Sequence, residues 1–209
     1  MIPILFEDDD IIVVDKPAGL ASQNTANKDI SLIDTLDKNV LPVHRLDQRV
    51  SGIILFAKNQ ETLTILNSDF KNRSVTKRYR AIVSNCPPKS EDTLIHWLQK
   101  NSNSSKSNVF KKEVAHSKQA ILKYKTVQSS IKYHLLQIDL FTGRFHQIRA
   151  QLSAIGCPIV GDVKYGFKRT TPDGSIFLQS FYLAFKHPKT KESLTFEIDI
   201  PILWNKYGF

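Results

Sequence analysis

The apolar residues of this 209-residue chain fall mostly into short runs that are typical of β-strands. Only residues 61–70 and 145–155 show the three-to-four-residue apolar spacing of a helix. Strands and helices therefore do not alternate, which favours an α+β fold built on a mixed, largely antiparallel sheet. The strand-like runs lie at 11–14, 53–57, 79–83, 118–127, 131–141, 176–185 and 193–200.

The residues between these runs predict how some of them connect. Ser129-Ser130 indicates a hairpin between 118–127 and 131–141, and the turn-like residues 187–190 join the last two runs. The stretch 101–108, Asn-Ser-Asn-Ser-Ser-Lys-Ser-Asn, is predicted to be an exposed loop and not a domain linker. No repeat of 20–50 residues is visible. We therefore expect a single domain over residues 1–209.

Positive charge is concentrated in two segments. The chain has 29 Lys and Arg residues against 20 Asp and Glu, a formal net charge of +9. Residues 71–80 contribute +5 and residues 100–125 contribute +6, so the rest of the chain carries −2. A local positive field favours a polyanionic partner such as a nucleic acid, because neutralised phosphates release condensed counterions. Exposed lysines that block edge pairing of a sheet would give the same pattern, so charge alone leaves both interpretations open.

The sequence excludes several classes of protein. Its longest apolar run, Ile53–Ala57, is far shorter than the ~20 residues of a membrane-spanning helix. The N-terminus lacks the basic and long apolar segments of a signal peptide. Cys86 and Cys157 suit a reducing compartment and give no disulfide framework. We expect a soluble cytoplasmic protein, and a monomer, because no heptad or long exposed apolar stripe is present.

No metal or cofactor site is expected. The six histidines show no His-x-x-x-His spacing, and the two cysteines are isolated from each other in the sequence. Neither Gly-x-x-x-x-Gly-Lys nor Gly-x-Gly-x-x-Gly occurs, so nothing supports a nucleotide cofactor. The chemistry therefore has to come from the side chains of the protein.

Asp47 is the first candidate for that chemistry. It stands between Arg45 and Arg49 in His44-Arg-Leu-Asp47-Gln-Arg-Val-Ser-Gly52, just before a predicted buried strand. Neighbouring guanidinium groups favour the ionised carboxylate, which suits a nucleophile or a base. An aspartate that caps a turn and pairs with Arg45 or Arg49 would produce the same triplet.

Two more clusters combine polar or basic residues with an apolar or aromatic surface. Arg149 follows Thr142-Gly-Arg-Phe-His-Gln-Ile148 on a predicted helix, where it could pair with a buried carboxylate, bind a phosphate, or lie on the helix surface. Tyr79 stands in Lys77-Arg-Tyr-Arg-Ala81. Basic residues around an aromatic ring provide base stacking and phosphate contact, although the segment is also an ordinary strand start.

Taken together, these segments resemble RNA pseudouridine synthases of the RluA type. His44-Arg-Leu-Asp47 with Ser51-Gly52 resembles the catalytic motif of that family, His-Arg-Leu-Asp-x-x-Thr-Ser-Gly. The similarity runs collinearly from residue 4 to about residue 190. It also includes Lys16-Pro-Ala-Gly19, Lys77-x-Tyr79-x-Ala81, Thr142-Gly-Arg-x-His-Gln-Ile148-Arg149 and Gly156-x-Pro158-Ile-x-Gly161-Asp162.

The resemblance implies roles for five residues. Asp47 would be the catalytic aspartate, and Arg149 the partner that holds it ionised. Tyr79 would stack on the target base, Arg45 would help hold the nucleotide flipped out, and Ile148 would line the pocket. The implied fold is the α+β pseudouridine synthase core with flanking helices and a central catalytic cleft. Many relatives also carry an N-terminal S4 RNA-binding domain, and this chain is expected to lack one.

Three positions depart from the family pattern. Val50 replaces the usual Thr, Gln151 stands where many members have His, and Gln179 replaces a frequent His. None of these positions carries an assigned chemical role. They bear on the subgroup to which the chain belongs.

The implied activity is an isomerase that converts uridines in rRNA or tRNA, in a compact stem-loop, to pseudouridine. The reaction needs no redox change, metal or cofactor, and the uridine has to be flipped out of the RNA to be reached. Two alternatives remain. A catalytically silent RNA-binding protein could keep the fold, and a glycosylase could use Asp47 to release a free base.

Overall fold

The structure is a computed structural model that describes residues 2–24, 30–36, 39–101 and 103–209. It divides into two compact units. The first unit comprises Met1–Lys77 and Gln179–Asp199, and the second comprises Arg78–Leu178 and Ile200–Phe209. Whether the whole of residues 1–209 acts as one catalytic domain stays a prediction.

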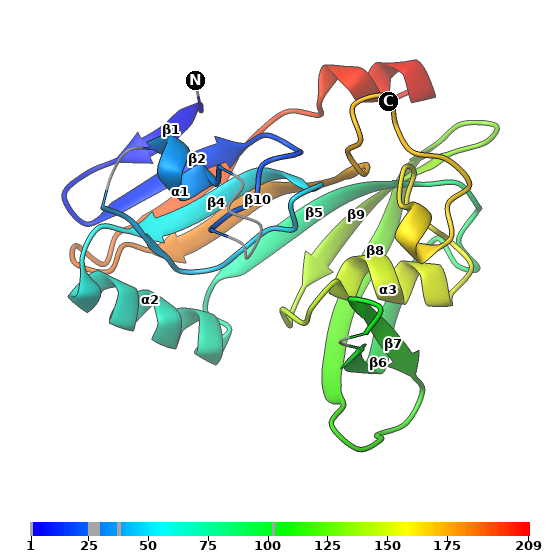
Figure 1. Ribbon diagram of the computed structural model, residues 1–209, viewed down its shortest axis with the longest axis horizontal. Coiled ribbons are helices and arrows are strands. Elements are labelled where there is room, and N and C mark those ends of the chain that lie inside the picture. The colour runs from blue at the N-terminus through cyan, green and yellow to red at the C-terminus, as the bar shows by residue number, and fades with distance from the viewer. Residues whose placement is uncertain (1, 25–29, 37–38, 102) are drawn as a thin grey trace. The chain divides into compact units, whose positions relative to one another are not determined.

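The first unit is built on a mixed sheet with the strand order β1-β2-β4-β10-β11 (Figure 1). Its pairs are antiparallel except for a short parallel contact of β10 with β4, and β3 adds to β4. The strands are β1 (Ile4–Glu7), β2 (Ile11–Lys16), β3 (Leu41–Pro42), β4 (Ser51–Ala57), β10 (Leu178–Lys186) and β11 (Ser193–Glu197).

Helix α2 (Gln60–Asn72) covers one face of this sheet, and α1 (Leu32–Leu36) is a short helix of the same unit (Figure 1). The side chain of Asn59 caps α2 by accepting a hydrogen bond from the N–H of Thr62, and Arg73 ends it in the left-handed conformation. Leu66 is fully buried against the sheet residues Ile53 and Leu55. The helix predicted over 61–70 is therefore confirmed.

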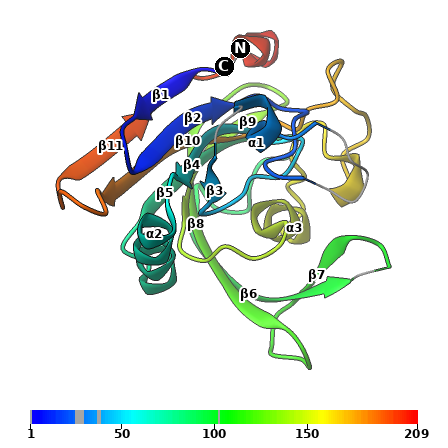
Figure 2. The same ribbon diagram turned by 60° about the vertical axis from the view of Figure 1, so that its left-hand side comes forward.

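The second unit carries an antiparallel sheet with the strand order β5-β9-β8-β6-β7. Helix α3 (Gln147–Ala154) packs against β6 and β7 on the inner side of the curved strands (Figure 2). Two short 3₁₀ helices complete the unit, η1 (Val163–Tyr165) and η2 (Ile202–Tyr207). The strands are β5 (Thr76–Val83), which begins in the first unit, β6 (Glu91–Asn101), β7 (Lys106–Phe110), β8 (Lys118–Ser129) and β9 (His134–Leu140).

The α+β class and the two predicted hairpins are confirmed. β8 pairs with β9, and β10 pairs with β11, both antiparallel. The predicted loop over 101–108 is wrong at its two ends, because Asn101 belongs to β6 and Lys106–Asn108 to β7. Pairing with β6 satisfies the backbone of this polar stretch, and Ser107 is buried because its side chain and N–H both find partners in the unit.

Gly52 shows how closely β4 and β10 approach each other. It has a φ of +117°, and a Cβ atom at this position would collide with the backbone of Ser180 on β10. Only glycine fits both the backbone conformation and the space. Gly52, five residues after Asp47, is therefore a packing requirement of the strand contact.

We expect Gly52→Ala to destabilise the protein by more than about 2 kcal/mol, because the added methyl group meets fixed backbone atoms. The measurement is the free energy of unfolding in urea. Gly143→Ala is the matched control, since a Cβ there would have nothing within 4 Å. Equal stability of the two variants would show that the β4–β10 contact is not this tight.

Candidate active site

Asp47 lies in the turn between β3 and β4 and is half-buried. Its carbonyl oxygen accepts a hydrogen bond of 3.0 Å from the N–H of Val50, which closes the turn. The flanking residues Leu46 and Val50 are 5% and 2% exposed. Two apolar anchors thus hold a short turn that leaves the carboxylate partly accessible.

Four hydrogen bonds, three of them through side chains, tie this turn to the segment that follows β2. The hydroxyl of Ser22 donates to the carbonyl of Leu46 at 2.8 Å, and the same hydroxyl oxygen accepts a hydrogen bond of 3.0 Å from the N–H of Leu46. Gly19 and Gln48 also make two hydrogen bonds with each other, one of 2.8 Å and one of 3.0 Å. The residues on either side of Asp47 are therefore both fixed to the same segment.

A buried lysine provides the third link. Lys16 has no exposed surface, and its ammonium group donates to the carbonyls of Pro17 and Leu20 at 2.8 Å and of Gln48 at 3.3 Å. Burial lowers the pKa of Lys16 to about 8, against the attraction of the Asp47 and Asp15 carboxylates, which raises it. At neutral pH Lys16 stays a cation. It therefore supplies a positive charge beside Asp47 in addition to its hydrogen bonds.

His44 supports the start of the same turn. Its Nε2 accepts a hydrogen bond of 3.1 Å from the N–H of Leu55 on β4, and its ring stacks on Phe70 of α2 with 5.0 Å between ring centroids. Burial, followed by the nearby Lys77, lowers the pKa of His44 to about 3. His44 is therefore neutral and orients the backbone. Arg45, by contrast, is exposed, and its role toward the nucleotide stays a prediction.

Arg149 on α3 forms a buried ion pair with Asp162. Its Nε donates to one carboxylate oxygen at 2.7 Å and its Nη2 to the other at 2.8 Å. The side chains of Arg149 and Asp162 are 5% and 0% exposed, and the guanidinium lies 5.0 Å from the ring centroid of Tyr165. Arg149 is thus no helix-surface residue. The sequence motif contained Asp162, but its role as this partner was missed.

The polar residues before Arg149 build the N-terminal end of α3. The side-chain oxygen of Gln147 accepts hydrogen bonds from the Thr142 hydroxyl at 2.8 Å and from the Arg144 N–H at 3.0 Å, and its amide donates to the carbonyl of Ile121 on β8. His146 adopts a left-handed conformation and contacts the hydroxyl of Tyr165 at 3.0 Å. The contacts of Thr142, His146 and Gln147 therefore stabilise the start of α3 and its attachment to the sheet.

Tyr79 and Ile148 are both buried in the second unit, with 6% and 5% exposure. Tyr79 lies on β5 opposite Ile138 of β9, and Ile148 lies on α3. The structure thus brings Tyr79, Ile148 and Arg149 into one unit and Arg45 and Asp47 into the other. Base stacking by Tyr79, lining by Ile148 and pairing of Arg149 with Asp47 stay predictions.

The three departures from the family pattern all lie in buried positions. Val50 anchors the Asp47 turn. The amide of Gln151 donates to the carbonyls of Leu94 and Ala120, which fixes α3 to β6 and β8. Gln179 on β10 donates to the carbonyl of Asp199 at 2.8 Å. Both glutamines hold backbone segments together.

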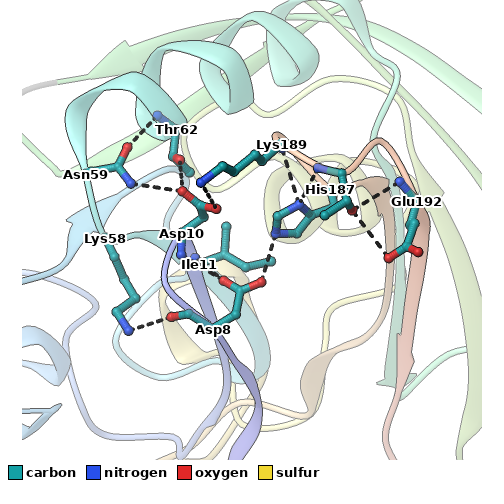
Figure 3. A network of polar contacts seen from close by, with 10 residues as sticks. Asp8, Asp10, Ile11, Lys58, Asn59, Thr62, His187, Lys189 and Glu192 are labelled. Carbon is teal, nitrogen blue, oxygen red and sulfur yellow. Dashed lines mark hydrogen bonds and ion pairs between the residues drawn. The ribbon is translucent and has the colours of Figure 1, made fainter.

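Asp8, Asp10 and His187 are the one group with metal-like spacing in the described part of the chain (Figure 3). The Nδ1 of His187 accepts hydrogen bonds from the N–H groups of Lys189 and Thr190, so the ring proton resides on Nε2, which donates to Asp8 at 2.9 Å. Asp10 in turn accepts from Asn59 at 3.1 Å. His187 has no lone pair left for a metal ion, and the group is a structural network that joins the β1–β2 and β10–β11 turns.

A family model described as RNA pseudouridylate synthase matches residues 10–154, well over half of the chain. The chain belongs to the RNA pseudouridylate synthase family. The resemblance inferred from the sequence motifs is therefore confirmed. Among the described residues, no helix of the family member has both the length and the apolar character needed to cross a bilayer.

Curated relatives of this family member match nearly all of it. An uncharacterised RNA pseudouridine synthase of Mycoplasma genitalium is 35% identical over 92% of the chain. A ribosomal large subunit pseudouridine synthase C of Rickettsia typhi is 31% identical over 97% of the chain. The chain spans 65% and 69% of the length of these two relatives.

Solved structures show the same fold. The human RNA pseudouridylate synthase domain containing 4 covers 97% of the chain and 90% of its own, with a TM-score of 0.79 at 20% identity. The human RNA pseudouridylate synthase domain containing 1 covers 98% of the chain and 86% of its own, with a TM-score of 0.79 at 24% identity. The predicted pseudouridine synthase type of α+β fold is confirmed.

We expect Asp162→Asn to lower the free energy of unfolding by about 3–5 kcal/mol, because it leaves the buried Arg149 guanidinium without its counter-charge. The matched control is Asp139→Asn. It breaks the Arg78–Asp139 pair, whose side chains are 40% and 37% exposed, and should cost less than about 1 kcal/mol. Similar urea unfolding curves for both variants would contradict the importance of the buried pair.

We expect Lys16→Met to loosen the Asp47 turn, since it keeps the apolar stem and removes the ammonium that binds three carbonyls. Amide hydrogen exchange should accelerate at least about tenfold at Leu46 and Val50. Lys58→Met is the control, because Lys58 makes an exposed ion pair with Glu7 in the same unit. Unchanged protection of the turn would rule out this role for Lys16.

Proposed function

We propose that the chain is an RNA pseudouridine synthase in which Asp47 is the catalytic group. The observation that carries the proposal is the turn over residues 46–50 of the first unit, which Ser22, Gly19 and Lys16 hold through hydrogen bonds and which we call the clamped turn. It holds a half-buried carboxylate between fixed backbone positions and beside the Lys16 ammonium. Such a carboxylate is positioned in advance, and a cation lies near it.

The proposed reaction rearranges bonds within one nucleotide. The N1–C1′ bond of uridine breaks, the uracil turns while it stays bound, and a C5–C1′ bond forms. The proton on C5 is lost, and N1 gains one, so the reaction is redox-neutral. An ionised Asp47 can attack C1′, remove the C2′ proton or add to C6 of the ring. Each route needs one fixed carboxylate, as the turn provides.

The other predicted residues act on the flipped uridine in this proposal. Flipping costs a few kcal/mol, and stacking on an aromatic ring such as Tyr79 returns roughly 1–3 kcal/mol. Ile148 would line the base pocket, Arg45 would hold the flipped nucleotide, and Arg149 would keep Asp47 ionised. The pair with Asp162 fixes the Arg149 guanidinium in a buried position, and a contact with Asp47 would come in addition to that pair.

We propose a structured RNA as substrate, either rRNA or a tRNA stem-loop, acted on in the cytoplasm by a monomer. The +11 charge of segments 71–80 and 100–125 supports a polyanionic partner. Relatives from Rickettsia carry names that refer to the large ribosomal subunit, so rRNA is the first pool to assay. Neither a redox cofactor nor a metal is needed for the proposed steps.

We expect Asp47→Asn to abolish isomerisation while RNA affinity stays within about twofold, because the amide keeps the shape but neither attacks nor takes a proton. The measurement is tritium release from RNA labelled at C5 of uridine. Asp9→Asn, which removes an equal charge from the exposed β1–β2 turn, is the control and should stay active.

The same assay separates the alternatives. Release of free uracil would indicate a glycosylase that uses Asp47. RNA binding without tritium release or free base, from both rRNA and tRNA pools, would indicate the catalytically silent binding protein. Tritium release that persists in Asp47→Asn would remove Asp47 from the mechanism.

A further inference from the structure

The second unit has a sheet face that α3 does not cover. Successive residues of a strand point to opposite faces. Leu98 and Ala120 pack under Ala150 of α3, so their neighbours Trp97 and Ile121 point the other way. Figure 2 shows α3 on the inner side of β6 and β8 only. We call the opposite face of these strands, to which Trp97 and Ile121 point, the outer face.

Apolar side chains gather on this outer face. Ile95 pairs with Ile121 across β6 and β8, and Trp97 pairs with Phe110 across β6 and β7. Phe141 lies beside Ile121, because its N–H donates to the Ile121 carbonyl. We call these five residues the outer-face patch. Ile95 and Phe141 are 54% and 45% exposed, and the other three are half-buried, so the patch is open to solvent.

Basic residues border the patch. Beyond the Ile95–Ile121 pair, the pairing of β6, β8, β9 and β5 aligns two further rows of side chains on the same face. Next to Trp97, the guanidinium of Arg144 donates to the carbonyl of Gln119. The two rows hold four basic and two acidic side chains, a formal charge of +2, and ion pairs join Arg78 to Asp139 and Lys123 to Glu91. The rows are Thr93, Lys123, Asp139 and Arg78, then Glu91, Lys125, Gln137 and Arg80.

The candidate site residue Tyr79 lies on the other face. Pairing places Tyr79, Ile138 and Tyr124 in one row across β5, β9 and β8. On β8, Tyr124 has the same parity as Leu122 and Ala120, and Ala120 packs under α3. Within the second unit, the outer-face patch therefore lies on the opposite side of the sheet from Tyr79.

We propose that the outer-face patch binds an unpaired segment of RNA, as a second contact beside the one at Asp47. Bases would stack on Trp97, Phe110 and Phe141, and phosphates would lie along the basic border. Aromatic side chains on an open sheet with basic neighbours provide both contacts that single-stranded RNA needs. The proposal rests on RNA being the substrate, as proposed above.

The charge of the border favours RNA over a protein partner. A phosphate backbone gains from each cation by counterion release, whereas charged residues are depleted at the core of protein interfaces. Arg78, Lys123 and Lys125 on one side and Arg144 on the other enclose the aromatic residues between cations. An RNA strand that crosses the patch would meet positive charge at both ends.

Tryptophan fluorescence tests this contact with a short oligouridylate as the probe. Trp97 is half-buried on the patch, whereas Trp204, the second of the two tryptophans, is 3% exposed. We expect the oligonucleotide to quench the wild-type emission and to leave Trp97→Phe unquenched, while Trp97→Phe still binds because its ring stacks. Quenching that persists in Trp97→Phe would overturn the proposal.

A pair of variants at Ile95 separates RNA from protein. Both remove the same exposed apolar side chain, and they differ in the sign of the added charge. We expect Ile95→Glu to weaken oligouridylate binding about tenfold at low salt and Ile95→Lys to keep or strengthen it. Ile131→Glu, at a 99% exposed position in the β8–β9 turn, is the matched control and should bind as wild type.

The remaining outcomes overturn the proposal in defined ways. If Ile95→Glu binds RNA as tightly as wild type, the patch does not contact RNA. If the wild type self-associates and both Ile95 variants are monomeric with unchanged RNA affinity, the patch joins two copies of the chain. Tritium release by the wild type is measured in parallel, so loss of the proposed isomerisation is distinguished from failure of the patch alone.

Discussion

The geometry around Asp47 depends on one buried ammonium group. Lys16 lies at the end of β2 and pairs with Gly52 at the start of β4. Its ammonium binds two carbonyls of the segment that follows β2 and one carbonyl of the turn that precedes β4. A buried cation is unfavourable unless its hydrogen bonds are made, so the carbonyls of Pro17, Leu20 and Gln48 have to converge on it. That convergence fixes the turn. The Asp47 carboxylate also attracts the Lys16 ammonium, which raises the pKa of Lys16 against the effect of its burial.

The second unit also contains a buried charged group that needs a partner, but here the charge is negative. Here the buried acid is Asp162, which has no exposed side-chain surface, and the bidentate Arg149 satisfies it. A bidentate pair restrains both the position and the plane of the guanidinium, which a single contact would not. The side-chain hydrogen bonds of Gln147 fix the start of the helix, and the ion pair fixes the Arg149 side chain that α3 carries. Each unit thus orders its key residue through burial of a charge that must be paired.

Local patterns were sufficient to predict the elements whose hydrogen bonds are made nearby. The α2 helix follows from its apolar spacing, and the β8–β9 and β10–β11 hairpins follow from their turns. The β6–β7 hairpin was missed, because its Asn- and Ser-rich strand is ordered by pairing and not by apolar alternation. The site shows the same division. Asp47 and Arg149 stood out in the sequence, while the clamp on Lys16 and the partner Asp162 depend on contacts between segments 32 and 13 residues apart.

The histidines show why a motif does not translate directly into chemistry. His44 belongs to the most specific motif of the chain, yet its Nε2 is occupied by the N–H of Leu55 and its burial keeps it neutral. His187 has both ring nitrogens engaged, one by backbone N–H groups and one by Asp8. A ring nitrogen whose lone pair already accepts a hydrogen bond is not available to a substrate. His44 and His187 therefore hold backbone segments of the first unit in place, and the proposal assigns the acid–base work to Asp47.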